Sequence, residues 1–263
     1  ITVSGTDVDT GTGPGDENDL SYSAESFSPG DVAVTMVGDQ LSMTPVLNYH
    51  GSVIIAVTVM DDGGLSGVEN FELTVNPVND APVMDGIAAQ STDEDLPLTI
   101  DISGSDVDTG TAPGDENILF FSAVSSDTNL VMVSTTSGDG SGNGTITFDV
   151  QPDQYGSADI MVIVTDNGGL SDSTETILTV YQVNDAPVVD QIAEQETDEE
   201  VPLTIVLSAS DVEGDELTFS AESDNESVAV SVDGDTLTMT PELNFNGTAN
   251  ITVIVSDAFL EDT

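Results

Sequence analysis

The chain has 263 residues, of which 50 are Asp or Glu and none is Lys or Arg, so its formal net charge is -50 at pH 7. Proteins neutralise phosphates and anionic lipid headgroups with basic side chains, so this composition excludes nucleic acid, nucleotide phosphates and direct contact with acidic membranes. It favours cations as partners. The absence of cysteine excludes a disulfide framework.

Short runs with strand periodicity follow one another along the whole chain, and no segment has helical periodicity. Residues 53–59 are apolar on both faces, as in a central strand of a sandwich, whereas residues 71–75 alternate apolar and polar side chains. Further along, residues 146–150 alternate in the same way and residues 160–164 are again continuously apolar. Clusters of Gly, Asn, Asp and Pro separate these runs. The pattern predicts an all-β fold.

The same landmarks recur along the chain. The hexapeptide VNDAPV at 78–83 returns at 183–188, which is 105 positions later and the length of one small β-sandwich domain. The other matched segments are TDEDLPLTI at 92–100 with TDEEVPLTI at 197–205, VMDDGGLS at 59–66 with VTDNGGLS at 164–171, and the DVD segments at 1–18 and 100–117, with a shorter third copy at 205–219.

These spacings predict three repeats: residues 1–80, incomplete at the N-terminal end, residues 81–185, complete, and residues 186–263, incomplete at the C-terminal end. We expect the chain to be a segment of a longer array. The alternative is a filament subunit whose open sheet edges are covered by strands of identical neighbouring chains.

The VNDAPV linkers, the DVD pairs and the DNGGLS-type turns resemble the cadherin-like tandem repeats of large secreted and surface proteins, mostly bacterial. The resemblance covers the whole chain. It implies tandem Ig-like Greek-key β-sandwiches arranged as an extracellular rod, secreted or on a cell surface. It also implies that Ca²⁺ clamps the linkers between neighbouring repeats.

The residue types fit this chemistry, because Ca²⁺ takes about six to eight oxygen ligands from carboxylates and carbonyls. Alternation along an extended segment places both acids of a DVD pair on the same side. The resemblance implies a first joint formed by Asn79, Asp80, Asp106, Asp108, Asn117 and Asp166. It implies a second joint formed by Asn184, Asp185, Asp211, Glu213, Asp215 and Asp257, approached by Glu94 or Asp93. An upstream joint would use Asp7, Asp9, Asn18 and Asp61.

One acidic pair of the cadherin pattern is only partly present. In the turns before the strands that lead to Asp61, Asp166 and Asp257, the acids are Asp153, which we count among the candidate ligands, and Glu242. The number of ions per joint is therefore open, and we expect the first joint to hold fewer.

We predict a calcium-stiffened structural or adhesive rod without enzyme activity. A glycosidase cleft needs sugar-stacking aromatic residues, and this chain has no Trp and only 4 Tyr. Alternative interpretations are a calcium-dependent module that binds surface glycans or aggregates cells, an accessory domain of an extracellular enzyme, and, for the acidic segments alone, solvated turns.

Overall fold

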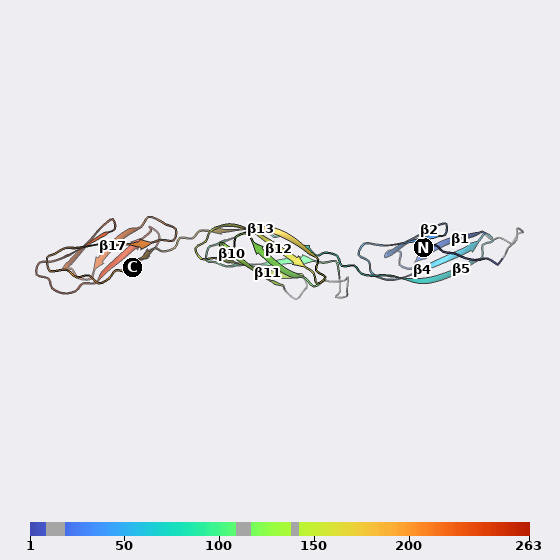
Figure 1. Cartoon of the computed structure of the whole chain (residues 1–263), viewed down its shortest axis with the longest axis horizontal. Helices are drawn as coiled ribbons and strands as arrows, with labels where there is room; N and C mark the ends of the chain where they lie inside the picture. Colours follow the sequence, from blue (N-terminus) through green and yellow to red (C-terminus); the bar gives the residue numbers. More distant parts are fainter. Residues whose placement is uncertain (9–18, 109–116, 138–141) are drawn as a thin grey trace. The chain divides into compact units, whose positions relative to one another are not determined.

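The computed structural model describes residues 1–8, 19–108, 117–137 and 142–263 (Figure 1). These residues form 21 β-strands and no helix, so the predicted all-β fold is confirmed. None of the described segments forms an apolar helix of membrane-spanning length.

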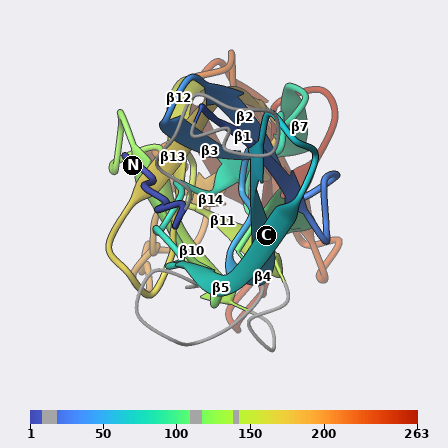
Figure 2. The same cartoon turned by 90° about the vertical axis from the view of Figure 1, so that its right-hand side faces the viewer.

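The first 80 residues form two small sheets around one core. The strands are β1 (Leu20–Ser26), β2 (Val32–Val37), β3 (Gln40–Pro45), β4 (Gly51–Asp61) and β5 (Ser66–Val75). β4 pairs with β1 on one side and with β5 on the other, and β4 and β5 lie side by side in Figures 1 and 2. β2 and β3 pair as the second sheet. The buried cluster consists of Val32, Leu41, Val53 and Ile55.

The next segment forms two four-stranded sheets. Its strands are β6 (Val83–Met84), β7 (Gln90–Asp93), β8 (Leu98–Ser105), β9 (Phe120–Ser125), β10 (Val131–Ser137), β11 (Asn143–Val150), β12 (Gly156–Thr165) and β13 (Ser171–Tyr181). One sheet has the order β10-β11-β8-β6 and the other β7-β13-β12-β9. The predicted alternation of residues 146–150 is confirmed, since Ile146, Phe148 and Val150 are buried. Burial of each such side chain contributes about 1.5–3 kcal/mol to folding.

The last segment has three short sheets, with the orders β14-β16, β15-β19-β18 and β17-β20-β21. The strands are β14 (Val188–Val189), β15 (Leu203–Val206), β16 (Ala209–Ser210), β17 (Thr218–Ser223), β18 (Val228–Asp233), β19 (Thr236–Pro241), β20 (Ile251–Ser256) and β21 (Glu261–Asp262). Leu207, Leu237, Met239 and Val253 form its buried cluster.

The two runs that are apolar on both faces are central strands, as predicted, but only one face of each is fully buried. Ile54 on β4 is 39% exposed and Met161 on β12 is 41% exposed. The described sheets cover β4 and β12 on the core side, so these outward side chains remain open to solvent.

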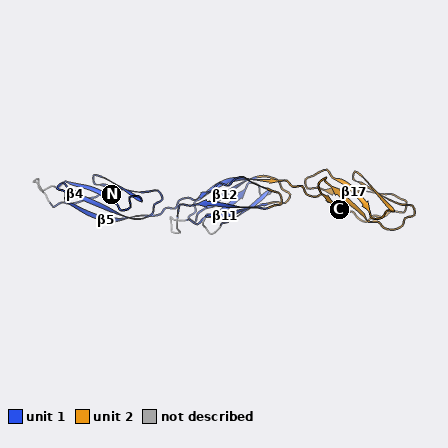
Figure 3. Cartoon of the chain, turned by 180° about the vertical axis from the view of Figure 1, so that it is seen from behind, with its two compact units in different colours: residues 1–90, 97–149, 158–178 blue, residues 91–96, 150–157, 179–263 orange. Residues whose placement is uncertain are grey.

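Contacts divide the chain into two compact units (Figure 3). One comprises residues 1–90, 97–149 and 158–178, and the other comprises residues 91–96, 150–157 and 179–263. The first linker and the acids hydrogen-bonded to it lie within the first unit, and those of the second linker lie within the second unit. The division into three repeats remains a prediction.

Candidate metal centres

The first linker is hydrogen-bonded to acidic residues that follow two strands. Asn79 Nδ2 donates to Oδ2 of Asp166 at 2.9 Å. The backbone N of Asp80 donates to Oδ2 of Asp108 at 2.9 Å, and the backbone N of Asp108 donates to Oδ1 of Asp106 at 3.1 Å. Asp106 follows β8 directly and Asp166 follows β12 directly, so the ends of two strands deliver these carboxylates to one place. The structure thus brings these five residues together, and their role as ligands remains a prediction.

The sixth predicted residue of this joint, Asn117, is half-buried. The backbone N of Ile118 donates to Oδ1 of Asn167 at 3.1 Å, which attaches the segment after Asn117 to the residue that follows Asp166. This bond places the residue after Asn117 beside the residue after Asp166.

Oxygen atoms in this group are buried without a hydrogen-bond donor. Among the described residues, Oδ1 of Asn79 and Oδ2 of Asp106 are inaccessible to solvent and have no partner. Asp108 and Asp166 are only 8% and 3% exposed. Burial raises the pKa of Asp106, and the negative charges of Asp108 and Asp166 raise it further, against opposing hydrogen bonds from the backbone. Buried acceptors left unpaired are unfavourable, and a cation relieves both effects.

Gly168 fits tightly against the Asn79 side chain. A Cβ at Gly168 would lie 2.8–2.9 Å from the amide atoms of Asn79. Gly168→Ala should displace this amide and lower the free energy of unfolding by about 1–3 kcal/mol, as overpacking does. Denaturant unfolding and the side-chain NH₂ resonances of Asn79 check this. Gly86→Ala is the control, because a Cβ there meets nothing within 4 Å. Wild-type stability with unchanged Asn79 resonances would contradict the predicted contact.

The second linker repeats the arrangement of the first. Asn184 Nδ2 donates to Oδ2 of Asp257 at 2.7 Å, as Asn79 does to Asp166. The backbone N of Asp185 donates to Oε2 of Glu213 at 3.1 Å, so the longer glutamate takes the place that Asp108 has at the first linker. Oδ1 of Asp211 accepts from the backbone N of Asp215 at 3.0 Å. The predicted residues of this joint therefore also meet.

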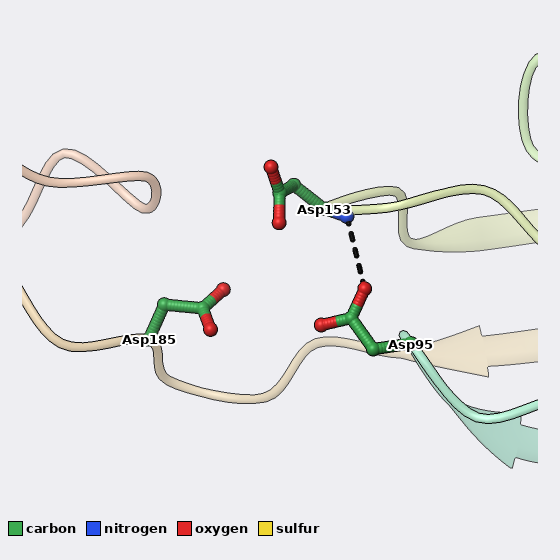
Figure 4. A group of neighbouring side chains, drawn as sticks. All are labelled: Asp95, Asp153 and Asp185. Carbon is green, nitrogen blue, oxygen red and sulfur yellow. Dashed lines mark hydrogen bonds between the residues drawn. The ribbon is translucent and has the colours of Figure 1, made fainter.

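Asp185 also belongs to a group of three carboxylates. Among the described residues, no such group is seen at the first linker. One carboxylate oxygen from each of Asp95, Asp153 and Asp185 lies within 4.8 Å of the other two (Figure 4). In Figure 4 the three side chains come from three separate segments and their carboxylates face a common space. The backbone N of Asp153 donates to Oδ1 of Asp95 at 3.3 Å. Burial raises the pKa of Asp185, and the charges of Glu213, Asp153, Asp95 and Asp211 add to the shift.

Glu94 is held in the core beside the second linker. It is 2% exposed, and its Oε1 accepts from the backbone N of Val183 at 2.6 Å. Its Oε2 has no hydrogen-bond partner among the described residues, and the same holds for Oδ2 of Asp185 and of Asp211. The expectation that Glu94 or Asp93 approaches this linker is met by Glu94, whereas Asp93 is exposed at the end of β7.

Asp95 is the residue that sequence reasoning missed. It is the last acid of TDED and its backbone has φ 63°, a left-handed conformation that turns its side chain away from the course of the preceding strand. Glu200, at the same place in TDEE, has φ 65°. The run of three acids before Pro97 was the available signal, but the sequence does not reveal the turn.

Asp153 also lies in a left-handed turn, with φ 55°. The corresponding turns hold Asn48 with φ 60° and Asn244 with φ 58°. Three turns thus share one backbone conformation, and only the middle one has a carboxylate at the left-handed position. An ion-count difference between joints remains a prediction.

A further pair of carboxylates anchors the strand that follows each linker. Oδ2 of Asp172 accepts from the backbone N of Met84, and Oδ2 of Asp262 accepts from the backbone N of Val189, both at 2.9 Å. The hydrogen bonds from the backbone of Met84 and Ser173 lower the pKa of Asp172. These residues position the linker and were not predicted.

The upstream joint is described only in part. Oδ1 of Asp61 accepts from the backbone N of Leu65 at 2.8 Å, matching the bond from Leu170 to Asp166. Asp9 and Asn18 lie outside the described residues, so the predicted grouping of these two with Asp7 and Asp61 remains a prediction.

The candidate ligand atoms of the two linker groups are oxygens of carboxylates and of side-chain amides. Hard cations such as Ca²⁺ prefer such oxygen sets, whereas Zn²⁺ favours nitrogen and sulfur ligands. The buried, unpaired oxygens of Asn79, Asp106, Asp185 and Glu94 are what a cation site requires, so the residues fit a divalent cation.

Comparison with known proteins supports the fold. The family described as Bacterial Ig domain matches residues 184–263. The structure of mouse cadherin-23 EC22-24 is 18% identical, with a TM-score of 0.54, over 99% of this chain and 87% of that one. Protocadherin gammaB7 EC3-6 is 19% identical, with a TM-score of 0.52, over 94% of this chain and 66% of that one. No curated protein matches the chain. These likenesses show a β-sandwich fold of the cadherin-like or Ig-like type.

Proposed function

We propose that this chain is a calcium-stiffened structural or adhesive segment of an extracellular protein, in which Ca²⁺ clamps the linkers at Asn79–Asp80 and Asn184–Asp185. The observation that carries the proposal is the meeting of Asp95, Asp153 and Asp185 within 4.8 Å, next to buried acceptors without donors. The fold likeness to cadherin structures and to the Bacterial Ig domain supports an extracellular setting.

The side chains and the backbone of the linker residues have separate roles. The side chains of Asn79 and Asn184 fix each linker to the acid after a central strand, and the backbone donors of Asp80 and Asp185 fix it to the second acid of the DVD or DVE pair. When bound, Ca²⁺ supplies a divalent charge that accepts about six to eight oxygens and offsets the repulsion between the carboxylates.

At the second linker, Glu94, Asp95 and Asp153 precede the linker in the chain, whereas Asp211, Glu213 and Asp257 follow it. Ligands from both sides therefore surround Asp185. Their shared binding free energy would restrict the linker and protect it from unfolding and proteolysis.

Asp95 offers the sharpest test of this proposal. Asp95→Asn should weaken calcium binding at the second linker by about 10–100-fold, because affinity follows the number of charged ligands. Isothermal titration with CaCl₂ measures it. Glu200→Gln is the matched control, since Glu200 has the same turn and lies outside the carboxylate group.

Three results are possible. Binding by the wild type with selective loss in Asp95→Asn supports the proposal. Equal loss in Glu200→Gln would show an effect of net charge instead of a ligand. Absence of saturable binding to the wild type would contradict the proposal that these linkers bind calcium.

A further inference from the structure

We propose that the outward face of β9, β12 and β13 is a docking surface for a protein partner that is apolar at its centre and carries lysine or arginine around it. The face presents Phe120, Val124, Met161 and Ile177, which are 52%, 59%, 41% and 48% exposed. Intervening residues of the same strands, such as Leu178, are buried in the core. This inference does not depend on calcium.

These side chains lie on one face of three neighbouring strands, with Val124 and Met161 as a cross-strand pair. In the antiparallel register of β9 and β12, Val124 lies directly opposite Met161 and Phe120 lies opposite Thr165. Side chains directly opposite each other have Cβ atoms about 4.5–5.5 Å apart and point to the same face. β13, which carries Ile177, is the next strand beside β12 (Figure 1).

The other two repeats have an acid on the first strand of this pair. The place of the Val124–Met161 pair is taken by Glu25 opposite Ala56 in β1 and β4, and by Glu222 opposite Thr252 in β17 and β20. Of three strand pairs with the same register, two thus have an acid at this position. Only the β9–β12 pair has two large apolar side chains there.

The position of Phe120 shows the same difference between the repeats. Its strand begins LFFSAVS, and the corresponding strands read LSYSAES and LTFSAES, with Ser21 and Thr218 in its position. The rest of the motif is nearly unchanged, so the sandwich does not require apolar residues at the two outward positions. Contiguous exposed apolar surface in a soluble protein marks an interaction site.

Charge selects the class of partner. Asp159 precedes Met161 by two residues and Glu175 precedes Ile177 by two, so strand alternation places both exposed acids on this face. A second copy of this chain has no Lys or Arg and would oppose these acids with acids. A partner with basic residues at the rim would pair with them, while the apolar centre supplies affinity.

The test uses a short synthetic peptide of alternating lysine and leucine, with a lysine–serine peptide of equal charge as control. Binding is followed by NMR of the methionine methyl groups at high ionic strength. Met161 lies in the proposed face, whereas Met132 is 53% exposed on β10 of the other sheet. We expect the lysine–leucine peptide to shift Met161 and not Met132, and the lysine–serine peptide to shift neither.

The variant Phe120→Ser/Val124→Glu carries the residues of the first repeat, which the same strand accommodates there. It should bind the lysine–leucine peptide about tenfold more weakly or worse, even though the added carboxylate attracts a cationic peptide. Equal shifts of Met161 and Met132, equal affinity for both peptides, or unchanged affinity of the variant would overturn the proposal. A dimer in sedimentation velocity that the variant abolishes would instead assign the face to a second copy, and would also overturn it.

Discussion

Removal of calcium with a chelator is expected to lower the melting temperature of this chain by about 10 °C or more. A ligand present at about 100 times its dissociation constant stabilises the folded state by about 2.7 kcal/mol, and 1 kcal/mol shifts the melting temperature of a small domain by about 4–8 °C. The chelated chain also retains the repulsion that raises the pKa values of Asp106 and Asp185. Differential scanning calorimetry with and without chelator measures the shift.

Two controls separate this effect from general screening of the net charge. Excess CaCl₂ should restore the melting temperature, whereas NaCl of equal ionic strength should restore only part of it. Melting curves that coincide with and without chelator would contradict a structural role for calcium.

Asp185→Ala is expected to destabilise the chain with calcium present but not without it. With calcium present it removes a ligand, so affinity should fall by about 10–100-fold and thermolysin should cleave the linker faster. Without calcium it removes a carboxylate whose pKa is raised by burial and by Glu213, Asp153 and Asp95, so the chain should be as stable as wild type or more stable.

Glu222→Ala is the control for this dependence of stability on calcium. Glu222 is an exposed acid on β17, and its removal changes the net charge by as much as Asp185→Ala does. Destabilisation by Asp185→Ala in both calcium states would show that Asp185 supports the fold directly. Unfolding of the segment after the second linker with calcium present would show the same, since its core of Leu207, Leu237, Met239 and Val253 does not include the linker.

Sequence periodicity predicted the strands, whereas the grouping of residues at the linkers came from the resemblance to cadherin-like repeats. Alternation predicted the buried Ile146 and Phe148, because a strand with one covered face needs period two. The resemblance to cadherin-like repeats, applied to the DVD and hexapeptide segments, implied that Asp106, Asp108 and Asp166 meet Asn79 and Asp80. Hydrogen bonds join these residues in the structure.

The remaining features depend on local conformation and on sheet coverage, which periodicity does not encode. Asp95 enters the carboxylate group through a left-handed turn, and Asp172 reaches the backbone of Met84 from a distant strand. The continuously apolar sequence around Met161 predicts a strand buried on both faces, but the outward face is exposed. A continuous apolar run does not show whether a second layer covers that face.

An anomalous difference map from crystals grown with calcium tests the central claim most directly. The account predicts a peak coordinated by carboxylate oxygens of Asp95, Asp153 and Asp185, with oxygen distances of about 2.3–2.6 Å. A map at saturating calcium without a peak at this group, or with peaks only on exposed acids away from both linkers, would contradict it.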